Sequence, residues 1–346
     1  MLLLLLQKII YFYFHNLEMN KLKLTIDKNT QPPSLTNKQI AFLHKYPELL
    51  PQYIADGNPS QDTLNAYRGR LESFLKWCEL SGFHPFKLQE AHIILYRKEL
   101  IDKGFKSTSI AAALTSIRKF YHLAQKLHLI TDNPAADVKA PRDPDAALID
   151  LPYLSIGKLE YLLQLIKPTN EKNLRDKVII AFMAIEGLRT IEIYRMNEED
   201  INVDQQSIFI RGKGKNAIIY PRQDTFKILL HYIKTKNREP LQQYIDNEEK
   251  TPVFTSTSNN KPGNRINRRN IREAVDLWLT RAGYKEKGKS DHMLRHTCAT
   301  LLYKETKDLK VVQETLRHSN INMTSKYAHL VEREDQRYTK AIPVEL

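Results

Sequence analysis

The stretch HMLRHTCATLL, residues 292–302, combines chemically active side chains with an apolar ladder that could hold them. His292 and Arg295 are three residues apart, so a helix would project both from one face. An imidazole and a guanidinium placed in this way could grip an anion such as a phosphate. The spacing of His292 and His296 also suits zinc, but Met293 stands where a zinc-protease helix has its glutamate. We therefore expect no metal here and interpret His296 as a packing residue.

Arg189 is a second candidate for binding an anion. It lies in IEGLRTIEIYRM, where Gly187 permits a tight approach just before a helical pattern continues. Glu192 follows three residues later, so its carboxylate could orient the Arg189 guanidinium. The alternative is an ordinary solvated arginine, which is where most arginines are found.

A third candidate is Lys213, in the segment RGKGKN. Gly212 and Gly214 flank it and leave the turn free to enter a groove. A lysine there could follow a phosphate and donate a proton to a leaving oxygen. The glycine spacing is not that of a phosphate-binding P-loop. The alternative is a charged hairpin tip that only keeps the chain soluble.

His318 and Tyr327 complete the set of candidates. His318 follows a helical pattern in which Val312 and Leu316 are expected to be buried. Tyr327 comes nine residues after His318. The chain holds 17 tyrosines, so Tyr327 would be interpreted as a packing or surface residue if it were considered alone.

Two domains are predicted to position these side chains. Apolar residues recur at helical spacing over residues 60–82, 88–104 and 107–130, with Ser60 as an expected N-cap and a further cap expected near Ser107. Three prolines then lie within residues 131–145, which is typical of a linker. We expect an N-terminal extension over residues 1–35, a helical domain over 36–139, a linker over 140–150, and a second domain with a C-terminal tail over 151–346.

The second domain is predicted to be mostly helical with a small sheet. Ile208 and Ile210 alternate with other residues, a glycine-lysine turn follows, and Ile218 and Tyr220 lie beyond it, so we predict a β-hairpin. The expected helices span residues 155–166, 173–196, 222–237, 268–282, 292–305 and 308–317.

The composition is that of a folded, basic protein. The 346 residues are 42% hydrophobic, which is enough to bury two cores and excludes a disordered chain. A formal net charge of +13 indicates a polyanionic partner, and nucleic acid is the first candidate. The alternative is a soluble protein that is merely basic. Cys78 and Cys298 have no metal-ligand spacing and are expected to be buried free thiols in a reducing cytoplasm.

The first residues, MLLLLLQKIIYFYF, are apolar but too short for a comfortable membrane span. They also lack the basic start and the cleavage site of a signal peptide. We expect Met19, which opens an ordinary polar sequence, to be the natural start. The alternative is a genuine hydrophobic anchor.

In combination and in this order, an arginine, a glycine-flanked lysine, H-x-x-R, a histidine and a tyrosine resemble the tyrosine recombinase family. That family includes the phage integrases and the Xer-type resolvases of chromosome dimers. The matching stretches are GLRTIEI, RGKGKNAIIYP, HMLRHTCATLL and DLKVVQETLRHSNINMTSKYAHL. They cover residues 150–330, and the preceding helical domain resembles the family's SAM-like core-binding domain. The resemblance implies a mainly α fold with a small antiparallel sheet, in which two domains form a C-shaped clamp on DNA.

The resemblance also implies an activity, namely site-specific cutting and rejoining of DNA during integration, excision or dimer resolution. A tyrosine would attack a phosphodiester and leave a 3′-phosphotyrosyl protein and a free 5′-hydroxyl. A partner strand's 5′-hydroxyl would then reverse the attack, so no ATP, metal ion or other cofactor is expected. The catalytic residues implied are Tyr327 as nucleophile, Arg189 and Arg295 as a phosphate clamp, Lys213 as the proton donor to the leaving oxygen, His292 as the residue assisting proton transfer with the tyrosine, and His318 as a hydrogen-bond donor to the scissile phosphate.

The sequence departs from the family pattern at two places. Arg317 stands where the family usually has a glycine, and Glu186 stands where it often has a threonine. An extra cation beside the site could contact phosphate or disturb the turn.

Double-stranded DNA is the expected partner, and basic side chains outside the catalytic set are candidate contacts. The candidates are Arg118, Lys119, Lys215, Arg265, Arg268, Arg269 and Arg272. The alternative for each is a solvated charged face. The resemblance implies a homo-tetramer on paired DNA sites, a monomer or weak dimer when free, a possible partner recombinase, a cytoplasmic location and no membrane association.

Two alternatives remain on the sequence alone. One is a DNA-binding accessory protein that has this fold without strand transfer. The other is an activity like that of a type IB topoisomerase, which shares the chemistry but exchanges no strands.

Overall fold

The computed structural model describes residues 35–142, 151–212, 216–236, 241–245, 248–257, 263–286, 290–318 and 321–335. The chain divides into two compact units between residues 147 and 148. Lys213, Lys215, Met19 and the C-terminal tail lie outside the described residues, so the predictions made for them stay predictions. Within the ranges given above, no helix is both long enough and apolar enough to cross a membrane.

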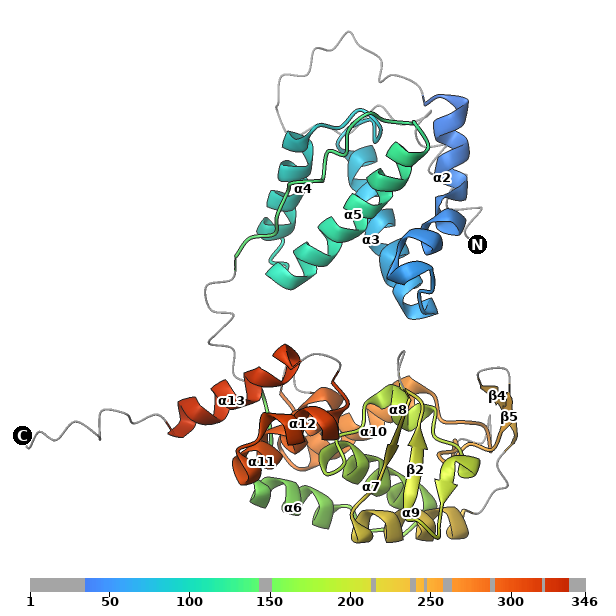
Figure 1. Cartoon of the computed structure of the whole chain (residues 1–346), viewed down its shortest axis with the longest axis vertical. Helices are drawn as coiled ribbons and strands as arrows, with labels where there is room; N and C mark the ends of the chain where they lie inside the picture. Colours follow the sequence, from blue (N-terminus) through green and yellow to red (C-terminus); the bar gives the residue numbers. More distant parts are fainter. Residues whose placement is uncertain are drawn as a thin grey trace, which may run out of the picture. The chain divides into compact units, whose positions relative to one another are not determined.

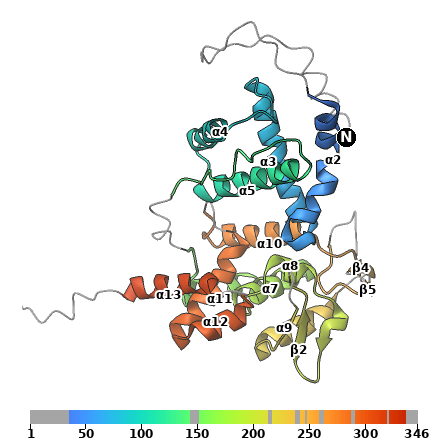
Figure 2. The ribbon, with the colours of Figure 1, turned by 45° about the horizontal axis from the view of Figure 1, so that its top comes forward.

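The first unit is a bundle of helices (Figures 1 and 2). Its elements are α2 (Asn37–Leu49), the 3-10 turns η1 (Leu50–Tyr53) and η2 (Ala55–Gly57), α3 (Gln61–Leu80), α4 (Glu90–Asp102) and α5 (Ser107–Lys126). Ser60 caps α3 as predicted, because its Oγ accepts the backbone N–H of Thr63 at 3.3 Å. The start of α5 was expected near Ser107, and Ser107 is the first residue of that helix, with Lys106 in the cap position and no side-chain hydrogen bond from it.

Aromatic rings fill the core of this unit. Phe42 and Phe120 have ring centroids 5.2 Å apart, and Phe74 and Tyr96 have centroids 5.1 Å apart, so α2 and α5 are joined, as are α3 and α4. Such pairs contribute free energy beyond the area they bury, about 0.5–1.5 kcal/mol each. Aromatic residues at helical spacing in this region therefore serve packing.

The second unit is mostly helical with two small sheets (Figure 1). Its elements are α6 (Ile156–Leu165), α7 (Glu171–Ala184), α8 (Thr190–Tyr194), η3 (Glu198–Asp200), β1 (Ile201–Asn202), β2 (Ser207–Ile210), β3 (Ala217–Ile219), α9 (Gln223–Thr235), β4 (Gln243–Ile245), β5 (Glu248–Lys250), α10 (Arg268–Arg281), α11 (Asp291–Thr306), α12 (Leu309–Leu316) and α13 (Asn322–Asp335).

The predicted hairpin is confirmed. Strands β2 and β3 are antiparallel, with Ile208 opposite Ile219 and Ile210 opposite Ala217. Strand β1 adds to the other edge of β2. Neither β1 nor the separate β4–β5 pair was predicted, because strands of two or three residues carry too little alternation to be recognised.

The prediction of one helix over residues 173–196 was wrong. The structure has two helices, α7 and α8, separated by a turn at Gly187, whose φ is +65°. A Cβ on Gly187 would lie 2.7 Å from Leu316 Cδ2 and 3.1 Å from Cys298 Sγ. The turn therefore requires glycine for its backbone conformation and also for the close approach of α11 and the end of α12.

Helix α11 is central to this unit, because it packs against α7, α10, α12 and α13. Its buried residues include Leu294 and Cys298, and Leu294 joins the main core built on α7. Cys298 lies in a second cluster with Val312, Leu316 and Tyr327, which come from α12 and α13. Both cysteines are buried free thiols, as predicted. Helix α13 was not foreseen, although it carries Tyr327.

Gly187→Ala is expected to destabilise the protein more than the same change at Gly283. Both glycines have positive φ, but a Cβ at Gly283 meets nothing within 4 Å, so Gly283→Ala isolates the backbone strain of about 1–2 kcal/mol. Gly187→Ala adds the overlap with Leu316 and Cys298. Urea unfolding of the two variants measures the difference, and equal losses would show that the close approach at Gly187 costs nothing.

Candidate active site

Arg189 stands at the N-terminus of α8, directly after the Gly187 turn. It is the N-cap residue, and its backbone N–H donates to Glu192 Oε2 at 2.9 Å. Its guanidinium Nη1 donates to Glu192 Oε1, also at 2.9 Å. The prediction that Glu192 orients Arg189 is confirmed. The Arg189 side chain remains 29% exposed while that of Glu192 is buried, so this guanidinium is accessible to an incoming anion.

Arg295 reaches the same place from α11. Its side chain is buried, and its two Nη groups donate to the backbone carbonyls of Gly187 and Leu316. Its Nη1 lies 3.9 Å from Glu192 Oε2. Burial, with the neighbouring Arg189, lowers the pKa of Arg295 to about 9, which still leaves the guanidinium charged at neutral pH. A guanidinium has five N–H donors, so the two carbonyl contacts leave donors for a phosphate.

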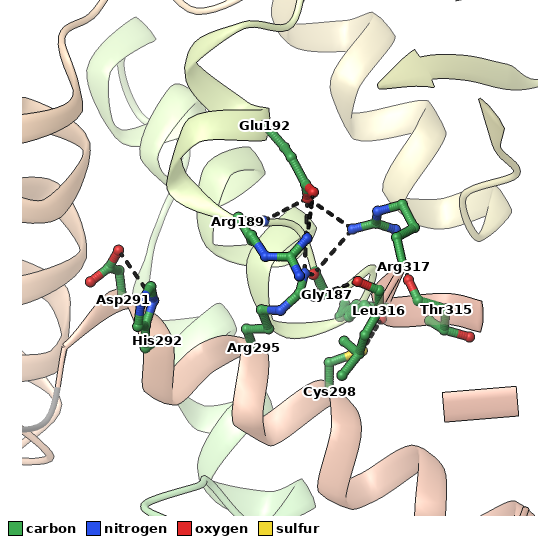
Figure 3. Close-up of polar contacts among 11 residues, drawn as sticks. Gly187, Arg189, Glu192, Asp291, His292, Arg295, Cys298, Thr315, Leu316 and Arg317 are labelled. Carbon is green, nitrogen blue, oxygen red and sulfur yellow. Dashed lines mark hydrogen bonds and ion pairs between the residues drawn. The ribbon is translucent and has the colours of Figure 1, made fainter. Parts of the chain in front are cut away.

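The predicted clamp therefore shares one buried carboxylate, and a third arginine joins it (Figure 3). Arg317 Nη2 donates to Glu192 Oε2 at 2.9 Å. Burial raises the pKa of Glu192, but the guanidiniums of Arg317, Arg295 and Arg189 and the backbone N–H of Arg189 outweigh burial and hold it below its usual value. Three guanidiniums around one carboxylate leave an excess of positive charge, which suits a phosphate.

His318 lies directly beyond Arg317 and is buried. Its Nδ1 is 2.8 Å from Thr324 Oγ1, so the ring is tied to α13. Burial, followed by the charges of Arg295, Arg189, Lys326 and Arg317, lowers the pKa of His318 to about 4. The ring is therefore neutral at physiological pH and can donate one hydrogen bond.

Tyr327 lies near these arginines, but its side chain is buried. It is 1% exposed, and its hydroxyl is 2.9 Å from His296 Nδ1. Burial raises the pKa of Tyr327 to about 12 although Arg295 and Arg189 lower it, so the phenol holds its proton at neutral pH. Lys326 also places its ammonium 5.2 Å from the centre of the Tyr327 ring.

His296 has a contact that the sequence did not predict. It was expected only to pack, and its partnership with Tyr327 has no signal in the spacing of the two residues. Burial, with the cations Lys326 and Arg295 and the two other histidines nearby, lowers the pKa of His296 to about 3. A ring with so low a pKa is a poor base, so this hydrogen bond holds the phenol and does not activate it.

The low pKa values of His296 and His318 predict that the free energy of unfolding falls as the pH drops from about 6.5 toward 3. Above pH 6.5 both rings are neutral in the folded and the unfolded state, so nothing is lost. Below pH 6.5 the two histidines become protonated in the unfolded chain. In the folded protein they stay neutral until the pH approaches their lowered pKa values. Urea unfolding at stepped pH measures the slope, and His296→Gln, which cannot titrate, should make it shallower. An unchanged slope would contradict the contribution of His296.

His292 is placed apart from the three arginines. Its side chain is 72% exposed, and its Nδ1 lies 3.8 Å from Asp291 Oδ2. Asp291 is itself buried and accepts a hydrogen bond from Thr190 at the start of α8. That contact joins the starts of α8 and α11, the two helices that position Arg189 and Arg295, so Asp291 helps to hold these helices together.

Glu186, the second departure from the family pattern, turns away toward α9. Its Oε1 accepts the backbone N–H of Arg222, the N-cap residue of that helix, at 3.1 Å. The structure thus gives this carboxylate a role in placing α9.

Two candidate DNA contacts serve the fold instead. Arg265 was expected to face DNA, but it is buried and donates to the carbonyls of Tyr194 and Met196 and to the Asn197 side chain. Arg118 is half-buried, and it donates to the carbonyls of residues 135, 136 and 138, which closes the end of the first unit onto α5. Arg265 is buried by its contacts, and the Nε and Nη2 groups of Arg118 are occupied by theirs, so we no longer propose either residue as a DNA contact.

The other candidates within the described residues lie at or near the surface. Arg269 and Arg272 project from the first turns of α10, where Arg269 pairs with Glu273 at 2.7 Å and Arg272 Nε lies 3.8 Å from Asp291 Oδ2. Arg268 begins the same helix, and Lys119 is half-buried on α5. No group of three or more His, Cys, Asp or Glu side chains that could hold a metal occurs in the part of the chain that is described.

Comparison with known proteins adds to this geometry. The model of the phage integrase family matches residues 154–334, and that of the phage integrase N-terminal SAM-like domain matches residues 48–126. Tyrosine recombinase XerC of Thermodesulfovibrio yellowstonii is 31% identical over 78% of this chain and 86% of its own length. Tyrosine recombinase XerD of Vibrio vulnificus is 26% identical over the same two shares.

Solved structures share the fold. The XerH site-specific recombinase bound to a palindromic difH substrate, in a post-cleavage complex, gives a TM-score of 0.65 at 19% identity over 80% of each chain. A lambda integrase dimer bound to a COC′ core site gives 0.63 at 16% identity over 83% of this chain and 94% of the other. The predicted fold class, mainly α with a small antiparallel sheet, is confirmed.

Proposed function

Because this chain belongs to the phage integrase family, we propose that it is a tyrosine-type site-specific DNA recombinase with Tyr327 as its nucleophile. The observation that carries the proposal is the meeting of Arg189 and Arg295, from two helices, on the buried carboxylate of Glu192. His318 and Tyr327 lie close enough to these arginines for the arginine charges to lower the pKa of both groups. A phosphodiester is the substrate that such a set of donors suits.

The proposed reaction begins with a DNA phosphate beside the arginines. The Tyr327 oxygen forms a bond to phosphorus, and negative charge builds on the two non-bridging oxygens. Arg189 and Arg295 donate hydrogen bonds to those oxygens, and His318 adds a neutral donor. The bond from phosphorus to the 5′-oxygen then breaks, which leaves a 3′-phosphotyrosyl link.

Two further roles complete the proposal. As the Tyr327 oxygen bonds to phosphorus, the exposed His292 assists the transfer by accepting the phenol proton, and Lys213 protonates the leaving 5′-oxygen. A 5′-hydroxyl of the partner strand reverses the sequence. Because the phosphotyrosyl bond conserves the energy of the broken linkage, the cycle requires neither ATP nor a metal ion.

We infer that Tyr327 moves before it attacks. In the structure its hydroxyl is bonded to His296, and its ring is buried among residues of α11 and α12. We take this as the resting arrangement, in which the nucleophile is kept from the phosphate. Assembly on DNA must break that hydrogen bond and shift α13.

The DNA-bound assembly is proposed by analogy with the relatives. A lambda integrase of similar fold has been solved as a tetramer bound to a Holliday junction. We propose a homo-tetramer on paired sites in the cytoplasm, acting in integration, excision or dimer resolution, with a second recombinase as a possible partner. The helical first unit serves as the DNA-binding domain, and Lys119, Lys215, Arg268, Arg269 and Arg272 are the proposed contacts outside the active site.

A suicide DNA substrate tests the function. It is a duplex nicked close to the cleavage point, so that the short 5′-hydroxyl fragment diffuses away and the covalent protein accumulates. We expect a protein–DNA adduct that resists denaturant, with the modified peptide containing Tyr327. Tight binding without an adduct would indicate an accessory DNA-binding protein. Relaxation of supercoiled plasmid without strand exchange would indicate a topoisomerase.

A further inference from the structure

Arg317 occupies a backbone conformation that favours glycine. It is the C-cap residue of α12, with φ 55° and ψ 45°, in the left-handed region that side chains with a Cβ rarely adopt. Nothing in the backbone therefore calls for an arginine here. The reason for one must lie in what its side chain contacts.

The Arg317 side chain is almost fully buried and makes several hydrogen bonds. It is 12% exposed, and Nη1 donates to the carbonyl of Thr315 at 2.7 Å. Nη2 donates to Glu192 Oε2 at 2.9 Å and lies 3.3 Å from the carbonyl oxygen of Gly187. Its Nε–H is buried and has no hydrogen-bond partner among the residues described. The guanidinium is thus directed inward, toward the active-site cluster.

Two of these acceptors, Glu192 and the Gly187 carbonyl, are far from Arg317 in the sequence, and both also bind the arginines of the proposed phosphate clamp (Figure 3). Glu192 also accepts from Arg189, and the Gly187 carbonyl also accepts from Arg295. Arg317 therefore touches the two groups that fix the other two guanidiniums. Its charge also helps to keep Glu192 ionised inside the protein, where burial alone would favour the neutral acid.

We propose that Arg317 is a positioning residue for the strand-cleavage step. It holds Glu192 and the Gly187 carbonyl in place, so that Arg189 and Arg295 are aimed at the scissile phosphate before DNA arrives. This inference rests on the proposed function. It predicts that loss of Arg317 slows chemistry at saturating DNA and leaves the affinity for DNA unchanged, because misplaced donors cost rate and need not cost binding.

The test is Arg317→Gly, in single-turnover cleavage of the suicide substrate. Glycine suits the left-handed backbone, so the variant should fold, and urea unfolding checks this. We expect the cleavage rate at saturating DNA to fall about tenfold to a hundredfold, with a dissociation constant for the DNA site within about threefold of wild type. Arg317→Lys, which keeps the charge and can still reach Glu192, should recover part of the rate.

Lys307→Gly is the matched control. Lys307 caps α11 with φ 53°, so this change also relieves a left-handed backbone, but it lies at an exposed position away from Glu192. It should cleave at the wild-type rate. Wild-type cleavage by Arg317→Gly would overturn the proposal, and so would a loss confined to DNA affinity, or an Arg317→Lys rate as low as that of the glycine variant. If the wild-type protein formed no adduct, that result would instead contradict the proposed function itself.

Discussion

Tyr327→Phe is expected to bind its DNA site as tightly as the wild type and to form no covalent adduct with the suicide substrate. The change removes only the oxygen that would bond to phosphorus, and the ring can still fill its buried position between α11 and α12. The loss should reach the detection limit of the assay, because no other step can replace the missing bond. Denaturing gel electrophoresis of the reaction measures the adduct.

Tyr303→Phe is the control for this experiment. Tyr303 is also buried in the second unit, at the C-terminal part of α11, so the substitution is chemically identical and similarly placed. It should keep the wild-type yield of adduct. Cleavage by Tyr327→Phe at a normal rate would refute the assignment of the nucleophile.

Arg295→Ala is the second change with a large expected effect, a loss of cleavage by about 10²–10³ or more. Removing this guanidinium deletes a donor to the phosphate oxygens as their charge grows. It also leaves the buried carbonyls of Gly187 and Leu316 without this donor, so some stability should be lost as well. Single-turnover cleavage at saturating DNA, below the unfolding temperature of the variant, separates the two effects.

Binding should respond differently at Arg295 and at Arg272. Affinity for duplex DNA is supplied by many phosphate contacts, so Arg295→Ala should retain most of it. Arg272 is 56% exposed at the start of α10. Arg272→Ala should weaken binding, reduce the dependence of affinity on salt, and leave the cleavage rate at saturating DNA near that of the wild type. If the two variants lost cleavage to the same extent, Arg295 would be no more than another DNA contact.

Much of this protein is predictable from its amino-acid sequence, because the relevant signals are local. Apolar residues at helical spacing and alternating isoleucines report which face of an element is buried. The three-residue step from Arg189 to Glu192 places both on one side of α8, and that contact is present at 2.9 Å. The order of an arginine, a lysine, H-x-x-R, a histidine and a tyrosine in the sequence indicates the chemistry before any distance between these side chains is known.

Other features depend on which elements lie against each other, and spacing along one element cannot report that. The break between α7 and α8 depends on Leu316 and Cys298 leaving no room for a Cβ at Gly187. Arg265 was expected to belong to a basic DNA-facing run, yet it is buried and its Nη1 donates to carbonyls at the end of α8 and just beyond it. A run of basic residues looks the same in the sequence whether the side chains face solvent or donate hydrogen bonds to backbone carbonyls inside the fold.

The surroundings of the proposed nucleophile and of the proposed arginine clamp also depend on contacts between elements that are far apart in the sequence. Tyr327 meets His296, 31 residues earlier, only because α13 packs on α11. Arg317 meets Glu192, 125 residues earlier, through the end of α12. Local residue patterns thus predicted the reacting groups, whereas long-range packing set the protonation, accessibility and partners of these side chains, since each of these depends on charges and burial contributed by other elements.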